Sequence, residues 1–382
     1  MRRPSAEKRR LRRAIKGSLR IQGFHFAEDR ITFRQRKSKR SIRKRHQHSV
    51  AKRIELARRS LAQHEDELLA FIASGTDVDP RRISPRLHQV QPGTVESRLF
   101  RYACLHWSIP ISDGYGRRLR FLIFDDANDK LIGLFGLGDP VYSIRARDEL
   151  IGWTATNRAA RLYHVMDAYV LGAVPPYSHV LGGKLVALAA ASDEVRLAFR
   201  ARYAGRRAIL SGRERQPHLV LLTTTSALGR SSIYNRIRFR QRFVFRSAGF
   251  TSGWGEFHFS DGVYDMLSNF AHGHCTPTAK RPEWGKGFRN RRELVRKALA
   301  QLGYSENMLN HGIQRELFTV PLARNAYAFL REETDVPLYY RMPFVTLARF
   351  WRRRWMLPRA ERDDSWSAFR NVEWRLWRKG AA

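Results

Sequence analysis

Residues 175–192, PPYSHVLGGKLVALAAAS, place two glycines and a lysine between an apolar run and a segment rich in alanine and leucine. The preceding residues, HVMDAYVLGAV (164–174), predict a buried strand, and residues 182–205 predict a helix. A strand that passes through a glycine turn into a helix presents unpaired backbone N–H groups and the positive end of the helix dipole. The stretch therefore predicts an α/β core and a candidate phosphate-binding turn.

The glycines of HVLGGK (179–184) lack the spacing of the G-x-x-x-x-G-K phosphate loop and of G-x-G-x-x-G. A Gly-Gly pair before an alanine-rich helix also serves tight packing, so both interpretations stay open. In a ligand site, the glycines would let a phosphate approach the backbone, and the lysine would add a positive charge. The candidate residues of this turn are His179, Gly182, Gly183 and Lys184.

A second turn of this kind follows the next predicted strand. HLVLLTTTSA (218–227) is rich in β-branched residues, and LGRSSIYNR (228–236) supplies Gly229, Arg230 and Ser231 after it. If the two strands are parallel neighbours, both turns open at the same carboxyl edge, where ligands bind in open α/β sheets. The sequence therefore predicts one anion-binding edge built from two turns.

The surrounding segments complete the predicted core. RLRFLIFDD (118–126) and KLIGLFGLGDP (130–140) predict two strands of a hairpin, SSIYNRIRFRQRF (231–243) a helix, and AGFTSGWGEFHFS (248–260) a strand. This order predicts a parallel α/β arrangement in the middle of the chain. We divide the chain into a basic arm and helix (1–78), an α/β core (79–275) and a basic, aromatic C-terminal extension (276–382).

The order of these elements resembles the acetyltransferase (GNAT-like) fold, in which a turn of pattern Gln/Arg-x-x-Gly-x-Gly/Ala holds the pyrophosphate of acyl-coenzyme A. Here His179 takes the first position and Gly182 the fourth, while Lys184 stands where a small residue belongs. The resemblance implies an α/β (α+β) fold: a GNAT-like mixed sheet with flanking helices, a basic helical N-terminal arm and a helical C-terminal extension. It also implies acyl-coenzyme A or another phosphate-bearing ligand as the cofactor.

Two residues are catalytic candidates. Under the same resemblance, Tyr234 is the proton donor to a leaving thiolate; the alternative is an aromatic residue packed on the sheet. Asp167 lies inside a predicted strand, where a buried carboxylate needs a partner. It is a candidate general base, and a satisfied core carboxylate is the alternative.

The charge of the chain points to a polyanionic partner. It has 71 Lys and Arg against 35 Asp and Glu, a net charge of +36, and residues 1–60 alone carry 22 against 4. Such a field attracts nucleic acid and makes the association salt-dependent; a solubilising tail or an arm on an anionic membrane is the alternative. The nucleic-acid-binding candidates, with DNA favoured over RNA, are Arg36, Lys37, Lys39, Arg40, Arg43, Lys44, Arg45, Arg117, Arg118, Lys286, Arg289 and Arg291.

Several other classes of protein are disfavoured. No run approaches about 18 consecutive apolar residues, as a membrane-spanning helix requires. The two cysteines, Cys104 and Cys275, are far apart, and no secretory signal follows the basic N-terminus, so we expect a cytoplasmic protein. HGHC (272–275) lacks a second half with zinc-like spacing, so no metal site is expected. Helicase motifs and a nucleophile elbow are absent.

Several ordered motifs carry a more specific resemblance, covering roughly residues 80–335. They include WSIPISDGYGRRLRFLIFD (107–125), the 175–192 stretch, LTTTSALGRSSIYNR (222–236) and NHGIQRELFTVPLARN (310–325). Together they resemble the DruA-like family, named for the Druantia anti-phage defence system and also found beside mobile elements. The resemblance implies a component of such a system, with other defence proteins as partners, and the basic charge of the chain predicts that this component binds nucleic acid. An acyl-coenzyme A- or nucleotide-dependent enzyme that modifies nucleic acid or protein is the alternative.

Overall fold

The computed structural model describes residues 5–27, 30–32, 38–111, 116–206, 216–231, 233–255, 258–259, 262–278, 284 and 288–377. The chain forms two compact units, each built from segments that are distant in sequence. The smaller unit comprises residues 1–53, 108–110 and 250–315, and the sheet unit comprises residues 54–107, 111–249 and 316–382. The division of the chain into residues 1–78, 79–275 and 276–382, made from the sequence, remains a prediction.

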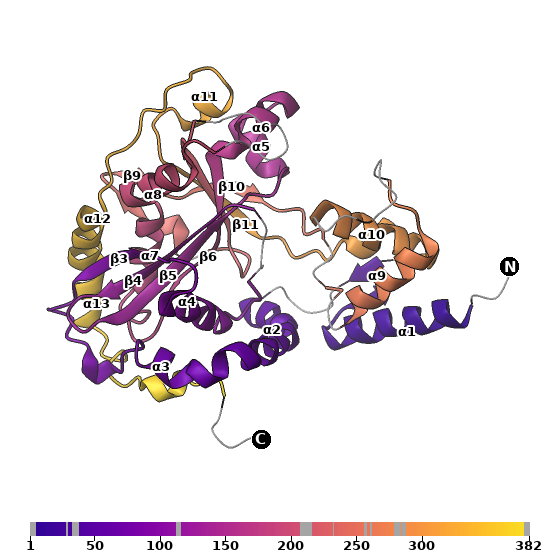
Figure 1. The fold of residues 1–382 in the computed structure, drawn as a ribbon, viewed down its shortest axis with the longest axis horizontal. Coiled ribbons are helices and arrows are strands. Elements are labelled where there is room, and N and C mark those ends of the chain that lie inside the picture. The colour runs from indigo at the N-terminus through magenta and orange to yellow at the C-terminus, as the bar shows by residue number, and fades with distance from the viewer. Residues whose placement is uncertain are drawn as a thin grey trace. The chain divides into compact units, whose positions relative to one another are not determined.

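The sheet unit is built on a seven-stranded mixed sheet in the order β10-β11-β7-β6-β5-β4-β3 (Figure 1). Its strands are β3 (Pro85–Gln89), β4 (Arg118–Asp125), β5 (Lys130–Gly138), β6 (Val165–Ala173), β7 (Leu221–Thr225), β10 (Arg246–Phe250) and β11 (Glu316–Pro321). Among the pairs whose register is described, β6–β7 is parallel and the others are antiparallel. The predicted hairpin of β4 and β5 is confirmed. Of the parallel arrangement predicted for the middle of the chain, only the β6–β7 pair is parallel among the pairs whose register is described.

Apolar side chains on both faces of the sheet explain why helices cover both faces (Figure 1). On β4, Leu119, Phe121 and Ile123 join one core cluster, and Leu122 and Phe124 join another, because successive strand residues point to opposite faces. The covering helices are α3 (Glu65–Leu69), α4 (Val95–Leu105), α5 (Arg145–Ile151), α6 (Ala155–Arg161), α7 (Gly182–Ala190), α8 (Asp193–Tyr203), α11 (Ala326–Leu330), α12 (Phe344–Trp351) and α13 (Leu357–Ala360). Short 3₁₀ turns span Ala62–His64, Gly75–Asp77, Leu162–His164, Tyr234–Arg236 and Asn371–Trp374.

Helix α7 packs on β5 and β6, and α12 packs on α7. The helix predicted over 182–205 is two helices, α7 and α8, which are separated at Ser192. The carboxylates of Asp193 and Glu194, at the start of α8, accept hydrogen bonds from the backbone N–H groups of Met342 and Phe344. Packing of the C-terminal extension onto this point therefore fixes the break.

One further prediction of local structure is wrong, and another is confirmed only in part. Residues 238–243, predicted as helix, form a hairpin of β8 (Arg238–Phe239) and β9 (Arg242–Phe243). Ile237 and Phe239 are buried while Arg238 and Arg240 are exposed, an alternation of period two that suits a strand. In residues 248–260, the strand β10 ends at Phe250, and Gly253 and Gly255 beyond it have positive φ angles of 73° and 153°.

The smaller unit contains the predicted basic arm as folded structure. Its elements are α1 (Ala6–Ile21), β1 (His25–Ala27), β2 (Arg30–Thr32), the first part of α2 (Lys39–Leu61), α9 (Val263–His274), α10 (Phe288–Gln301) and a 3₁₀ turn (Glu306–Leu309). Leu11, Ile15 and Leu19, four residues apart on α1, are buried in one cluster with residues of α9 and α10. Among the described residues, no helix has the length and apolar character needed to cross a membrane.

Candidate functional site

The parallel strands β6 and β7 separate part of the way along their length, and we call this point the fork. They pair only over Val165–Asp167 and Leu221–Thr223, although β6 continues to Ala173. The predicted turns HVLGGK and LGRSSIYNR follow β6 and β7, so they lie at the same edge of the sheet, as expected for parallel neighbours. The two turns approach each other beyond the fork, where Ile233 of the second turn is the nearest residue to Gly183 of the first.

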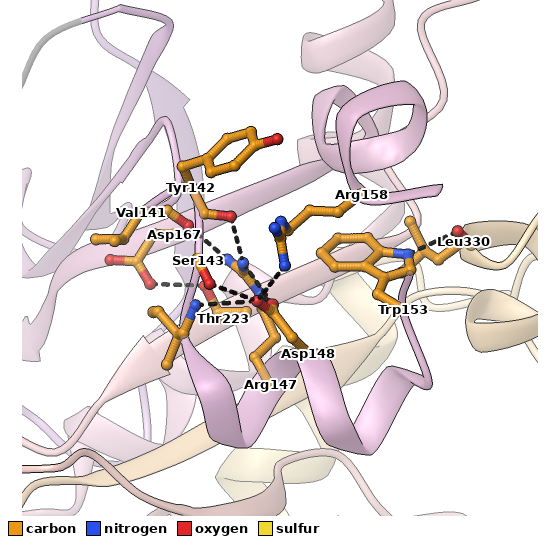
Figure 2. A network of polar contacts seen from close by, with 11 residues as sticks. Val141, Tyr142, Ser143, Arg147, Asp148, Trp153, Arg158, Asp167, Thr223 and Leu330 are labelled. Carbon is orange, nitrogen blue, oxygen red and sulfur yellow. Dashed lines mark hydrogen bonds and ion pairs between the residues drawn. The ribbon is translucent and has the colours of Figure 1, made fainter. Parts of the chain in front are cut away.

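Asp167 is the last β6 residue paired with β7 before the strands separate. The hydroxyl of Thr223 donates a hydrogen bond of 2.7 Å to the carboxylate of Asp167 (Figure 2). Burial raises the pKa of Asp167 to about 6, against the smaller opposite effects of this hydrogen bond and of the positive charge of Arg147. A carboxyl group that titrates this close to neutral pH has the property of a general acid or base.

Tyr234 lies in the 3₁₀ turn after β7, with its ring stacked on Phe245 at a centroid distance of 4.7 Å. Burial and the negative charge of Asp167 raise the pKa of Tyr234 to about 12, while a hydrogen bond with Thr224 opposes the shift. The structure thus brings both catalytic candidates, Asp167 and Tyr234, within electrostatic reach of one another. The phenol keeps its proton at neutral pH and can act as a donor.

A buried ion-pair network lies beside the fork and was missed by the sequence analysis (Figure 2). Arg147 is fully buried; its guanidinium donates to the backbone carbonyls of Val141 and Tyr142 and pairs with Asp148 at 2.7 Å. Arg158 pairs with the other carboxylate oxygen of Asp148 at 3.1 Å. Burial lowers the pKa of Arg147, and the charges of Asp148 and Asp167 oppose this. The sequence carried one signal that Arg147 is buried. It lies one helical turn before the apolar Ile151, so both residues are on the buried face of α5.

The first glycine turn is largely occupied by the protein itself. A Cβ added at Gly182 would lie 2.7 Å from the carbonyl oxygen of Tyr177, so Gly182 is required for close packing. At Gly183 the nearest atom to an added Cβ would be 3.5 Å away, on Ile233. The indole N–H of Trp351 donates to the carbonyl of Leu181 at 2.9 Å.

The other two candidates of this turn differ in exposure. The side chain of His179 is exposed, and its carbonyl accepts a hydrogen bond from Arg359. The ammonium group of Lys184 lies 4.4 Å from the ring centroid of Trp355. Lys184 therefore has an aromatic partner and still belongs to the surface around the start of α7.

The second turn already holds an anion, the buried carboxylate of Glu316 on β11. Glu316 accepts hydrogen bonds from the backbone N–H of Ser231 (3.2 Å), the amide of Asn235 (3.4 Å) and the hydroxyl of Ser247 (3.0 Å). The carbonyl of Gly229 accepts from the backbone N–H of Glu316 at 3.0 Å. The protein's own carboxylate thus takes the place expected for a ligand phosphate, while the side chain of Arg230 is exposed.

The basic candidates of α2 line an open surface pocket of about 480 Å³ in the smaller unit, which we call the α2 groove. Its lining residues are Arg40, Arg43, Lys44, Gln47, Val50 and Ser108. The first three are exposed, and within the described ranges none of them forms an ion pair. Lys39 is exposed at the start of the same helix. Arg36, Lys37, Lys286 and the side chains of Arg45 and Arg289 lie outside the described residues.

Of the remaining basic candidates, Arg117 has its hydrogen-bond donors taken by the protein, and Arg118 lies near an aromatic ring. The guanidinium of Arg117 pairs with Asp139 at 2.6 Å and donates to the carbonyls of Tyr163 and Val165. Arg118 lies 5.9 Å from the ring centroid of Tyr169. Arg117 thus links the start of β4 to Asp139 and to β6, and its guanidinium is not available to a ligand.

Arg291, on α10, lies 3.9 Å from the ring centroid of Tyr264. Over the part of the chain that is described, no group of three or more His, Cys, Asp or Glu side chains is arranged to hold a metal ion.

Fold and site together define a mixed α/β protein with an internal polar fork and a basic groove whose three cations have no ion-pair partner among the described residues. A family model described as "Druantia protein DruA" matches residues 36–332, and the chain belongs to this family. A curated relative, Druantia protein DruA from Escherichia coli (strain UMEA 4076-1), is 38% identical over 370 residues, which cover 97% of this chain and 90% of the relative. No solved structure matches the chain.

Proposed function

We propose that this protein is a nucleic-acid-binding component of a Druantia-type anti-phage defence system, or of a related mobile element, acting in the cytoplasm with other defence proteins. Membership of the DruA family supports the defence role. The α2 groove is the observation that carries the binding role, because it gathers three exposed cations that have no ion-pair partner among the described residues.

The composition of α2 supports contact with phosphates. Its 23 residues include nine Lys or Arg and a single acidic residue, Glu55. Arg40, Arg43 and Lys44 are three or four positions apart or adjacent, so their side chains project from one stretch of the helix surface. Phosphate contacts of this kind supply most of the free energy of sequence-independent binding.

The lining of the groove favours a duplex as its partner. None of its six lining residues is aromatic, whereas proteins that hold single strands stack bases on aromatic rings. A phage-directed system favours DNA over RNA, and the binding experiment decides between them.

The test is fluorescence anisotropy with the full chain and labelled DNA and RNA duplexes of about 20 base pairs, at about 0.05 to 0.3 M salt. We expect binding whose logarithmic association constant falls linearly with the logarithm of salt concentration. Absence of binding at the lowest salt, or affinity that salt does not change, would contradict the proposal.

A second candidate function rests on the fork: an enzyme with a GNAT-like core that uses acyl-coenzyme A or another phosphate-bearing ligand. Its support is the electrostatic influence of Asp167, with a pKa of about 6, on Tyr234, which keeps its proton. The packing of Gly182 and the occupation of the second turn by Glu316 count against it.

Calorimetric titration with coenzyme A tests this second candidate. Gly183 has room for a larger side chain, so Gly183→Asp places an anion at the turn and Gly183→Ala is its neutral control. The enzyme hypothesis expects binding by the wild-type protein and by Gly183→Ala but not by Gly183→Asp. Lack of binding by the wild-type protein removes the main support for the hypothesis.

A further inference from the structure

The β8–β9 hairpin is built around an unusual turn. Arg238 pairs with Phe243, and Phe239 with Arg242, across a two-residue connection. Both connecting residues, Arg240 and Gln241, have positive φ angles, 47° and 63°. Two left-handed residues are what a tight hairpin of type I′ requires, and glycine or asparagine normally supplies them. An arginine held in this conformation lowers the stability of the folded protein. A function of the Arg240 side chain would explain why arginine occupies this position.

The inner side of the hairpin is fixed to the sheet unit. Phe239 is buried, and its ring meets that of Phe350 edge-on at a centroid distance of 5.1 Å. The guanidinium of Arg242 lies 3.5 Å from the ring centroid of Tyr340 and donates to the carbonyl of Pro321. These contacts hold the hairpin in place, so its outer side chains have a defined position.

The outer side carries cations next to an exposed aromatic ring. Arg236, Arg238 and Arg240 are exposed, and in the described part of the chain none of them forms an ion pair. The guanidinium of Arg238 lies 3.9 Å from the ring centroid of Phe243, whose side chain is 39% exposed. The hairpin therefore differs from the α2 groove, which has no aromatic residue in its lining.

Further cations lie beside the inner side of the hairpin, where Phe239 packs on Phe350 of the C-terminal extension. The ring of Phe350 meets that of Trp355 at 5.1 Å, and Trp355 in turn lies against the ammonium group of Lys184. Trp355 and the exposed Arg354 come from one π-helical turn, Arg352–Met356. Burial lowers the pKa of Lys184, and the positive charges of Arg236 and Arg354 lower it further. Lys184 is thus repelled by both arginines, and an anionic ligand would relieve that repulsion.

We infer that this hairpin surface, defined by Lys184, Arg236, Arg238, Arg240, Phe243 and Arg354, binds single-stranded nucleic acid. The cations contact phosphates, and Phe243 offers a face on which an unpaired base stacks. The inference rests on the proposed nucleic-acid function and adds a second contact surface with a different preference.

The test uses two hairpin variants of the full chain. Arg238→Thr with Arg240→Gly removes two charges, and glycine suits the left-handed position. Phe243→Ala removes the ring. The control is Arg86→Ala with Arg145→Ala, which removes two exposed arginines that are already paired with carboxylates.

Anisotropy is measured with a labelled thymidine oligonucleotide and with a duplex. Losing two contacts at about 0.7 each lowers the salt slope for the single strand by about 1.4, and its affinity about tenfold at about 0.15 M salt. We expect a loss of roughly tenfold for Phe243→Ala, and duplex affinity that stays close to that of the control.

Single-strand affinity equal to the control in both hairpin variants would overturn the inference, while duplex binding by the wild-type protein would leave the proposed function standing. No binding of any oligonucleotide by the wild-type protein would overturn both. If a variant fails to fold, photo-crosslinking of the wild-type protein to a thiothymidine strand replaces it. Crosslinks on residues 236–243 or 350–355 support the inference, and crosslinks confined to other peptides contradict it.

Discussion

The α2 groove leads to a quantitative prediction about salt dependence. The perturbation is the triple variant Arg40→Ala, Arg43→Ala and Lys44→Ala, which removes three exposed cations from the groove. Alanine is the best helix-forming residue, so the variant keeps α2 intact. The expected effect is therefore on binding and not on folding.

The magnitude follows from the number of phosphate contacts. Each cation that neutralises a phosphate of duplex DNA contributes about 0.9 to the salt slope, so three contacts contribute about 2.7. Extrapolated from about 1 M salt, where this contribution vanishes, the triple variant loses about 100-fold in affinity at about 0.15 M salt. At about 0.05 M salt the loss exceeds about 1,000-fold.

The assay is anisotropy with the labelled duplex across a salt series. The matched control is Arg86→Ala, Arg145→Ala and Arg296→Ala, which lowers the net charge equally but removes arginines paired with carboxylates. Far-ultraviolet circular dichroism confirms that both variants are folded. If the two triple variants show the same salt slope, the groove has no special role and general charge explains the binding.

Three further predictions concern the fork and its surroundings. The rise in the pKa of Asp167 from 3.8 to about 6 favours the folded state at low pH and is lost as pH rises through about 6. Asp167→Asn should therefore gain about 2.5 kcal/mol relative to wild type between about pH 4 and pH 7 in urea unfolding, and a pH-independent difference would contradict this. Gly182→Ala should lower the free energy of unfolding by about 1–3 kcal/mol, because the added methyl group collides with its surroundings. Gly183→Ala adds a methyl group where there is room and should leave the free energy of unfolding nearly unchanged. Equal melting temperatures of the two variants would refute the packing argument. Arg147→Met should cost about 3–5 kcal/mol, because it leaves Asp148 and two carbonyls without their buried partner, and a urea midpoint equal to that of wild type would show the network to be dispensable.

The elements that follow from local pattern were predictable. The hairpin of β4 and β5, the strand β6, the start of α7 at the glycine turn and the parallel pairing of β6 with β7 agree with the sequence analysis. Long apolar runs and turn residues decide such elements locally. The hairpin at 238–243 was also visible in the alternation of arginine and apolar residues, and was wrongly predicted as helix.

The candidate site was predictable only in part. Sequence reasoning selected Asp167 and Tyr234, and the fold brings them together at the fork. It could not show that Glu316, far along the chain, fills the second turn, or that Arg117 is bound to Asp139. Each of these outcomes depends on a partner from a distant segment.

The basic character of the chain, its mixed α/β core and its membership of the DruA family could all be inferred from the sequence. Charge, hydrophobic periodicity and ordered motifs are local properties of the chain, so they need no knowledge of the fold. Tertiary structure decided which of the basic residues are available to a ligand. Arg117 and Arg40 are indistinguishable as residue types, yet one is enclosed by a carboxylate and carbonyls and the other lines an open groove. An arginine whose N–H donors are already taken by acceptors of the protein has none left for a phosphate.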